Sequence, residues 1–398
     1  MRQFLLTTAL VFLGLLPLAS VLLGVSVPIA AFAAPFHPDA WEAMSEEERI
    51  RLSPEPSNSA LAVLSQATAS HRRWTPHPRT LVLLVDFEDK PSSPGYDIPH
   101  FESLLFELDR ELYGSLRDYY REATYNKIDV TGKVYGWFRM PLHYVDYADG
   151  QQGFGGDFPR SAKGLTHHAL EAAVEAGVDI TQFDSDGPDG IPNSGDDDGV
   201  IDALMIVHAG FGTERTRSLD DIRSHYWTTV GDLQIDGIRI PDYAMVPELE
   251  NVGIMVHEYG HLLGAPDLYD LSGRGNGLGW FSVMAWAIWY NNGREPGGPD
   301  PYTSMMCGVL KPEVPGGDEP RLTMPAINHN DYALRLWTEG AVGKEYFLVE
   351  YRKTMGIDRY LFGDGLLIYH VDERAMRQDN PARYLVRLVQ ADGHRSLE

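Results

Sequence analysis

The sequence lacks the features of a disulfide-stapled domain and of a nucleic-acid-binding protein. Its 398 residues include one cysteine, Cys307, so the chain cannot form an internal disulfide. Basic residues are also scarce, 33 against 57 acidic ones, which gives a formal net charge of −24. Because such a charge repels phosphate, nucleic acid is excluded as a partner. Hydrophobic residues make up 43% of the chain, as in ordinary globular proteins.

The first 34 residues are the longest apolar stretch of the chain, and no comparable run follows them. Within residues 1–34 only Arg2 is charged, and Ala31-Phe32-Ala33 near the end of this stretch is an A-x-A pattern. We predict that residues 1–33 form an export signal cleaved after Ala33, so that the protein is secreted. The alternative is an uncleaved anchor facing outside, because the apolar stretch exceeds the roughly 20 residues that span a bilayer. Membrane contact is expected only in that second case.

Residues 34–78 differ in composition from the rest of the chain. They are polar, charged and interrupted by prolines, which indicates a pro-segment or linker. An ordinary N-terminal extension packed on the domain surface is an equal alternative. The globular domain, residues 79–398, begins where Leu81-Val82-Leu83-Leu84-Val85 forms the short apolar run typical of a buried strand.

The pattern along this domain alternates between helix and strand. We expect helices over residues 101–123 and 162–176. We expect a pair of strands over 127–140, turning at Thr131-Gly132, a buried strand over 200–207, and further strands over 346–351 and 365–371. Helices interleaved with strands predict an α/β or α+β fold.

The most informative stretch contains His257-Glu258-Tyr259-Gly260-His261. Apolar residues around these positions recur at helical spacing, and the two histidines lie one turn apart on the opposite side of the predicted helix. Two imidazoles at i and i+4 bind zinc in this arrangement, while Glu258, beside the first of them, serves as the general base. The spacing predicts a catalytic metal site.

A third ligand is expected from the chain after the helix. Gly264 suits a left-handed cap and Pro266 prevents the helix from continuing, so the chain turns back. Asp267 follows His261 by six residues, and its carboxylate would complete three protein ligands and leave a fourth position for water. That open position distinguishes a catalytic zinc site from a structural one.

The extended pattern from His257 to Asp267 resembles the immune inhibitor A family of secreted bacterial metallopeptidases, which are metzincin-like zinc proteases. The resemblance includes SLRDYYREATYNKIDVTGKVYGW from Ser115 and GLLIYHVDE from Gly365. It implies that His257, His261 and Asp267 bind zinc and that Glu258 is catalytic. A carboxylate is a harder ligand, in the hard–soft sense, than a third imidazole. The ligand set therefore does not by itself select zinc over other metals, and zinc is an inference.

The same resemblance implies an architecture. We expect an upper subdomain with a twisted sheet and the zinc helix, up to about residue 264, and an irregular, strand-containing lower subdomain over 265–398, with the active cleft between them. The family's domain continues beyond ADGHRSLE, so we expect the chain to be truncated at its C-terminus. Met284 matches the methionine turn beneath the zinc; the alternative is a core methionine among Trp280, Phe281 and Trp286.

The stretch from Asp184 to Asp202 is a second candidate metal site. It crowds seven aspartates among glycines, and oxygen ligands on a flexible loop suit calcium. Family members carry a comparable acidic loop. A solvated acidic turn is the alternative. The calcium ligands we expect are Asp184, Asp186, Asp189, Asp196, Asp198 and Asp202.

These patterns predict a secreted zinc-dependent endopeptidase that hydrolyses peptide bonds of protein or peptide substrates through water activated by Glu258. The alternatives are a surface-anchored, calcium-stabilised binding protein with a vestigial zinc site, and a zinc esterase or amidase. We expect Zn²⁺ and Ca²⁺ as cofactors and a monomer. His208, His225 and His370 are expected to be structural, and Cys307 buried.

Overall fold

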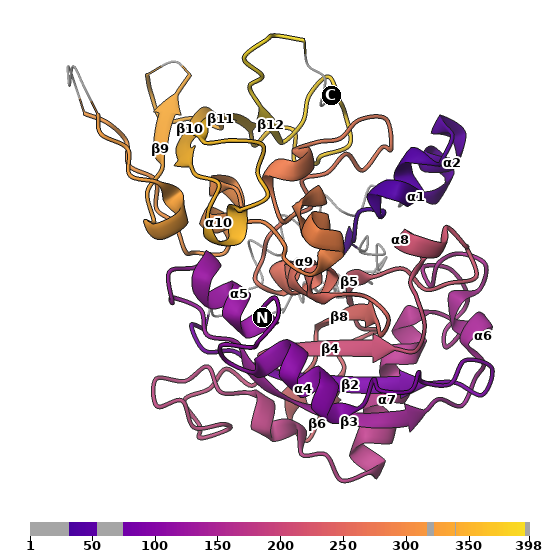
Figure 1. Cartoon of the computed structure of the whole chain (residues 1–398). Helices are drawn as coiled ribbons and strands as arrows, with labels where there is room; N and C mark the ends of the chain where they lie inside the picture. Colours follow the sequence, from indigo (N-terminus) through magenta and orange to yellow (C-terminus); the bar gives the residue numbers. More distant parts are fainter. Residues whose placement is uncertain (1–31, 54–74, 317–321, 339, 395–398) are drawn as a thin grey trace, which may run out of the picture.

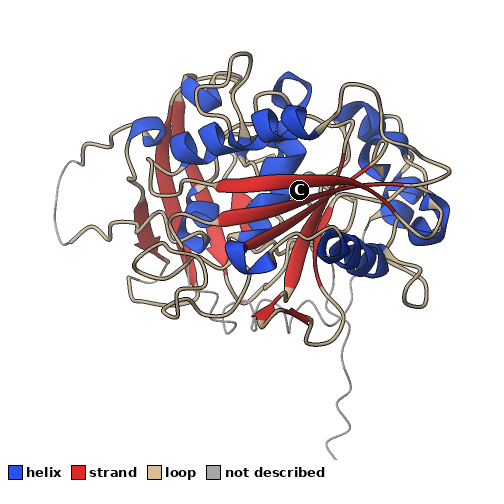
Figure 2. Cartoon of the chain, turned by 90° about the horizontal axis from the view of Figure 1, so that it is seen from below, coloured by secondary structure: helices blue, strands red, loops and turns tan. Residues whose placement is uncertain are grey.

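The structure is a computed structural model that describes residues 32–53, 75–316, 322–338 and 340–394. A six-stranded mixed sheet lies at its centre (Figures 1 and 2). Across the sheet the strands are β1 (Phe32–Ala33), β5 (His225–Thr228), β8 (Asp242–Pro247), β4 (Ala203–His208), β2 (Arg79–Asp86) and β3 (Thr131–Arg139). The last four run parallel, whereas β5 is antiparallel to β8 and β1 is antiparallel to β5.

Strand β2 lies between β4 and β3, and its burial on both faces explains why its sequence is continuously apolar. Leu81, Leu83 and Val85 belong to one core, which includes residues of α7 (Ala162–Glu175). Val82 and Leu84 belong to the other core. That second core receives α4 (Ile98–Phe106), α5 (Leu116–Ala123) and α9 (Val252–Leu262). A strand covered on both faces has no exposed positions, so the alternation of polar and apolar residues disappears.

Strands within residues 334–388 form a second sheet, drawn in orange and yellow at the top of Figure 1. Its antiparallel order is β12 (Val386–Leu388), β11 (Gly365–Asp372), β10 (Glu345–Arg352) and β9 (Leu334–Trp337). The remaining elements are α1 (Pro38–Glu42), α2 (Glu46–Leu52), α6 (Tyr144–Ala148), α8 (Thr213–Thr216), α10 (Pro301–Met306), β6 (Gln234–Ile235) and β7 (Ile238–Arg239). Helix α9 lies between the part with the six-stranded sheet and the part with the four-stranded sheet.

Two expected elements are wrong. The helix expected over 101–123 is divided into α4 and α5, because Asp109, Leu112, Tyr113 and Gly114 have positive φ and Ser115 caps a new helix. The strand pair expected over 127–140 is the single strand β3. Gly132 does not form a turn there: a Cβ at this position would lie 2.4 Å from the Thr80 carbonyl oxygen and 2.5 Å from the Phe106 ring. The glycine permits close packing in the sheet instead of a chain reversal.

The N-terminal residues reach the centre of the molecule. Residues 32–53, here called the N-terminal segment, contribute β1 to the sheet and then form α1 and α2 (indigo in Figure 1). Residues 1–31 of the predicted export signal lie outside the described part of the chain. Within the part that is described, no helix has the length and apolar character to cross a membrane.

Candidate active site

Helix α9 brings two histidines to one point. The rings of His257 and His261 are buried, with centroids 4.8 Å apart. The chain then leaves the helix at Gly264, whose φ of +97° is the left-handed conformation expected there, and returns with Asp267. One carboxylate oxygen of Asp267, Oδ1, lies 3.1 Å from His257 Nε2 and 3.3 Å from His261 Nε2. The three predicted ligands therefore converge, with ligand atoms within 4.8 Å of one another.

The backbone fixes which nitrogen of each histidine faces this point. His257 Nδ1 donates to the Val283 carbonyl at 2.9 Å, and His261 Nδ1 donates to the Ala265 carbonyl at 2.7 Å. With Nδ1 carrying the proton, the Nε2 lone pair of each ring can bind a metal ion placed between the rings and Asp267. Burial lowers the pKa of His257, which favours the neutral ring that a metal requires.

The electrostatics of Asp267 also suit a cation. Burial alone would raise the pKa of this carboxyl, but the two histidines outweigh it and leave the pKa below its usual value. Its second oxygen, Oδ2, is buried without a hydrogen-bond partner among the described residues. Two neutral imidazoles and a carboxylate with a spare oxygen fit a divalent metal such as zinc.

Glu258 lies beside this cluster and is fully buried. Burial and the negative charge of Asp267 raise its pKa well above the usual value, while the nearby Ala34 N–H and Arg223 lower it. Neither carboxylate oxygen has a hydrogen-bond partner of ordinary geometry in the described structure. A carboxylate beside a metal site can accept a proton from water and return it to a leaving group.

Met284 lies directly under α9, at the position expected for a methionine turn. A Cβ on Gly260 would be only 2.8 Å from Met284 Sδ, so glycine within the histidine motif permits this contact. The Leu268 amide donates to the Met284 carbonyl at 2.7 Å. Because Val283 also accepts the bond from His257, this turn supports both the helix and the Asp267 loop.

The N-terminal segment covers the site. Strand β1 pairs with the edge strand β5, with Ala33 opposite His225. Tyr269 donates its hydroxyl hydrogen to the Ala33 carbonyl, and Arg223 donates to the Ala34 carbonyl through Nη2 at 2.6 Å and Nε at 3.1 Å. The sequence analysis identified neither side chain. Tyr269 could have been considered, because it follows Asp267 by two residues, whereas nothing in the sequence around Arg223 relates it to the site.

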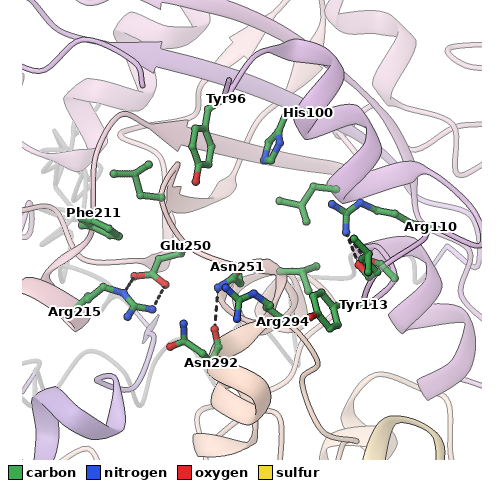
Figure 3. A pocket seen from close by; sticks show the side chains of 15 residues that line it. Tyr96, His100, Arg110, Tyr113, Phe211, Arg215, Glu250, Asn251, Asn292 and Arg294 are labelled. Atoms are coloured by element: carbon green, nitrogen blue, oxygen red, sulfur yellow. Dashed lines mark hydrogen bonds and ion pairs between the residues drawn. The ribbon is translucent and has the colours of Figure 1, made fainter. Parts of the chain in front are cut away.

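A cavity of about 440 Å³ opens beside the first turn of α9 (Figure 3). In it the guanidinium of Arg215 points to Glu250, with Nη2 2.7 Å from Oε2, Arg110 lies on the opposite side, and Arg294 lies between Asn251 and Tyr113. Asn292, which lines the cavity, also contacts the N-terminal segment, because its Oδ1 bonds His37 Nε2 at 2.8 Å.

The acidic loop forms a smaller cluster than expected. Asp184, Asp186 and Asp197 bring carboxylate oxygens within 4.8 Å of one another, and Asp197 was not among the expected ligands. Burial and the neighbouring aspartates raise the pKa of Asp184 to about 7. The other four expected ligands accept hydrogen bonds from the protein. Asp189 accepts from Ile191 N, Asp196 from the Ser194 hydroxyl and Asp198 from Val200 N. Asp202 accepts from Arg79 N and the Ser185 hydroxyl.

The three histidines expected to be structural have hydrogen-bond partners in the fold. His208 Nδ1 bonds the Ala209 carbonyl at 3.0 Å, His225 bonds the Arg223 carbonyl and the Tyr243 hydroxyl, and His370 bonds Glu345 at 2.9 Å. Burial lowers the pKa of His208 to about 4 and that of His225 to about 3. Cys307 is buried as a free thiol.

Comparison with known proteins agrees with this geometry. The family model for the catalytic domain of immune inhibitor A peptidase M6 matches residues 74–306, more than half of the chain and all of the site. The chain belongs to the immune inhibitor A peptidase family. The family resemblance inferred from the sequence is thus confirmed over residues 74–306.

Two relatives show how far the similarity extends. Immune inhibitor A of Bacillus thuringiensis subsp. alesti is 36% identical over 250 residues, which are 53% of this chain and 36% of that protein. The pre-pro-metalloprotease PrtV of Vibrio cholerae serotype O1 is 29% identical over 251 residues, 53% of this chain and 27% of that protein. The chain therefore matches about a third of the length of these relatives.

Proposed function

We propose that this chain is a zinc-dependent endopeptidase that acts outside the cell on protein or peptide substrates. The observation that carries the proposal is the convergence of His257, His261 and Asp267 with the unpartnered carboxyl of Glu258 beside them. The family and the metalloprotease relatives support the reaction class. The A-x-A pattern at residues 31–33 supports export.

In the proposed reaction His257, His261 and Asp267 hold zinc. Bound zinc supplies Lewis acidity, which activates water and polarises the peptide carbonyl. Glu258 accepts a proton from the attacking water and then donates it to the amide nitrogen as the C–N bond breaks. The water oxygen remains in the new carboxylate, and the amine leaves. The Nδ1 hydrogen bonds of the histidines keep both rings in place throughout.

We further propose that residues 34–78 are a pro-segment that keeps the enzyme latent. The support is the position of its described part: Ala34 is buried and its carbonyl accepts from Arg223, and Trp41 packs on Trp286 with ring centroids 5.8 Å apart. The Vibrio cholerae relative is itself named a pre-pro-metalloprotease. An arginine in place of Ala34 has no room in this closed space, so Ala34→Arg should displace the segment and raise activity.

The test is digestion of casein by the zinc-loaded full chain carrying Ala34→Arg, with and without a zinc chelator. We expect hydrolysis that the chelator abolishes. Adding Glu258→Ala should reduce the rate by several orders of magnitude while zinc content stays at one ion per chain, because the ligands remain and the proton shuttle is gone. Glu350→Gln, which neutralises a buried carboxylate in the C-terminal sheet, is the control and should stay active.

Retained turnover in Glu258→Ala would remove that residue from its role. A protein that binds zinc but hydrolyses neither casein nor peptides, even with Ala34→Arg, would contradict the peptidase proposal and favour a binding protein.

A further inference from the structure

We propose that the cavity beside the first turn of α9 is a second substrate-binding site, which holds an acidic side chain of the protein or peptide being cleaved, and that Arg110 and Arg294 bind its carboxylate. This inference rests on the peptidase function proposed above. It adds a substrate class, namely chains in which an acidic residue flanked by apolar residues lies a few residues away from the scissile bond.

The cavity lies at the carboxyl ends of the parallel strands. Among its lining residues Tyr96 follows β2, Phe211 follows β4 and Leu249 follows β8. In open α/β sheets, ligands bind in the crevice beyond these strand ends, where the loops diverge. The volume of about 440 Å³ is also within the range of small-ligand pockets. Both the position and the size of the cavity therefore suit a bound group.

The charge of the cavity is opposite to that of the chain. The chain has 57 acidic and 33 basic residues, but the charged residues that line the cavity are three arginines and one glutamate. Arg215 and Glu250 neutralise each other in an ion pair. Burial and the nearby Arg110 lower the pKa of His100, so this ring is neutral near pH 7. The charges of Arg110 and Arg294 remain, and they attract an anionic group.

These two arginines lie against one short loop (Figure 3). Nη1 of Arg110 donates to the Leu112 carbonyl at 3.0 Å and to the Gly114 carbonyl at 3.1 Å. The guanidinium of Arg294 lies over the Tyr113 ring, 5.9 Å from its centroid. Neither arginine has a carboxylate partner in the part of the chain that the structure describes. Guanidinium groups held by neutral partners keep both their charge and spare N–H donors for a carboxylate.

The start of α9 adds to the attraction for an anion. Asn251 stands at the N-cap position but makes no side-chain bond to the helix. Its Nδ2 donates instead to the Asn292 carbonyl at 2.9 Å. The first turn at Val252 therefore faces the cavity without a side-chain cap. The positive end of the helix dipole strengthens a site that the two arginines define.

The rim of the cavity is apolar and exposed, which favours a peptide over an inorganic anion. Leu112 is 76% exposed, Tyr113 49% and Phe211 39%. Leu112 and Tyr113 have φ of +60° and +79°, so the backbone holds both side chains outward in a conformation that such residues rarely adopt. A small anion would contact none of this surface, whereas apolar residues on either side of an acidic one would cover it.

The cavity is close enough to the metal site for one substrate chain to reach both. Val252 lines the cavity and His257 is a metal ligand of the proposed site, and both belong to α9. Five residues of helix separate their positions by about 7.5 Å along the axis. An extended peptide rises roughly 3.3 Å per residue, so about three residues cover this distance. We therefore expect the acidic residue about three to five residues from the scissile bond.

Binding is tested without catalysis, in the zinc-loaded full chain carrying Glu258→Ala, where the N-terminal segment still covers the metal. The capped peptide acetyl-Gly-Leu-Glu-Phe-Gly-amide is titrated by calorimetry. We expect saturable 1:1 binding, about 10-fold weaker or more when glutamine replaces glutamate in the peptide, and about 10-fold weaker or more when the protein carries Arg294→Gln. Arg387→Gln on β12, an arginine that also lacks a carboxylate partner among the described residues, is the matched control and should bind like the parent.

Arg110 is tested by its charge, because it also supports the loop. Arg110→Lys should bind the peptide within about threefold of the parent, whereas Arg110→Gln should bind about 10-fold more weakly. Raising NaCl from about 0.05 M to about 0.5 M should weaken binding of the glutamate peptide and leave that of the glutamine peptide unchanged. Equal affinity for the two peptides, or no effect of Arg294→Gln, would overturn the site. A glutamine peptide that regains binding through a free C-terminus would assign the cavity to chain ends and overturn the acidic side chain.

Hydrolysis by the Ala34→Arg chain then relates the cavity to the reaction. A quenched fluorescent peptide that this chain cleaves at one bond is varied by placing glutamate or glutamine at each position around that bond. At a position about three to five residues away, glutamate should raise kcat/KM about 10-fold over glutamine, through a lower KM. Arg294→Gln should bring this ratio close to one, whereas Arg387→Gln should preserve it.

The outcomes distinguish this inference from the proposed function. Peptide binding that depends on Arg294, without hydrolysis by any variant, would leave the cavity as an acidic-peptide site and contradict the peptidase. Hydrolysis with equal kcat/KM for glutamate and glutamine at every position would support the peptidase and overturn the inference.

Discussion

The two candidate metal sites of this protein are built in opposite ways. The cluster of His257, His261 and Asp267 is fixed by a buried helix, a returning loop and backbone carbonyls that orient both rings. The cluster of Asp184, Asp186 and Asp197 lies on a turn-rich loop, and only Asp184 among its three members is buried. The first site is organised before a metal arrives; the second consists of carboxylates that repel one another.

This difference predicts different consequences of metal removal. In the histidine site the ligands carry little net charge and are held by the fold, so loss of the metal should abolish activity but leave most of the structure. In the acidic loop the cation itself offsets the repulsion, so its loss should cost local stability and leave the chemistry untouched. Substitutions and metal titrations at the two sites test this difference.

The largest effect is expected from His261→Ala. With two ligands instead of three, zinc affinity should fall by several orders of magnitude, and zinc should be lost during dialysis against a weak chelator. Metal content measured by atomic absorption checks this. Asp184→Asn in the acidic loop is the comparison and should retain one zinc per chain; full zinc occupancy in His261→Ala would show that the metal binds elsewhere.

The support beneath the helix is tested by Met284→Ala. Deleting this buried side chain leaves a cavity under Gly260, and the free energy of unfolding should fall by about 2–5 kcal/mol. Denaturant titration measures the change. Met355→Ala, at a position 37% exposed, should stay within about 0.5 kcal/mol of the parent. An equally small effect at Met284 would mean that the turn does not support the site.

A smaller effect is expected from calcium. In zinc-free Glu258→Ala protein, millimolar calcium should raise the melting temperature by about 2–4 °C if the dissociation constant is near 0.1 mM, and magnesium should substitute poorly. Asp197→Asn should remove this shift, whereas Asp189→Asn, outside the three-residue cluster, should keep it. Superimposable melting curves with and without calcium would show that the loop is only a solvated turn.

The smallest effect is the pH dependence of that shift. Asp184 has its pKa raised to about 7 in the folded protein, so the fold holds this proton more tightly than the unfolded chain does. Without calcium, its contribution to stability is therefore present at low pH and is lost as the pH rises from about 4 to 7. Calcium competes with the proton, so the calcium-induced shift in melting temperature should be larger at pH 8 than at pH 5. A shift independent of pH would exclude Asp184 as a ligand.

Much of the catalytic region could be predicted from the sequence. The spacing of His257 and His261, the helix stop at Gly264 and Pro266, and the return of Asp267 depend on neighbours within eleven residues of one another, and local geometry determines them. The buried strands β2 and β4 were likewise predicted from their apolar runs, and β10 and β11 were predicted as strands. The errors occurred where tertiary packing prevailed over local pattern, as in the close approach of Gly132 to β2.

The acidic loop shows what could not be predicted from the sequence. Composition alone predicted that aspartates would gather, but it could not select Asp197 over Asp189, because the choice depends on which backbone amides each carboxylate accepts as the loop folds. Carboxylates on a loop have no fixed period, so sequence spacing does not define a common face.

The amino-acid sequence was enough to predict that His257, His261 and Asp267 converge with Glu258 beside them, because one helical turn and one chain reversal place all four residues. What covers these residues depends on tertiary contacts. Ala34 and Arg223 are 189 residues apart and Ala33 and Tyr269 are 236 apart, and no local pattern relates such positions. They meet because an edge strand leaves its backbone groups unpaired, and the extended N-terminal segment pairs with that edge where Glu258 and Tyr269 lie.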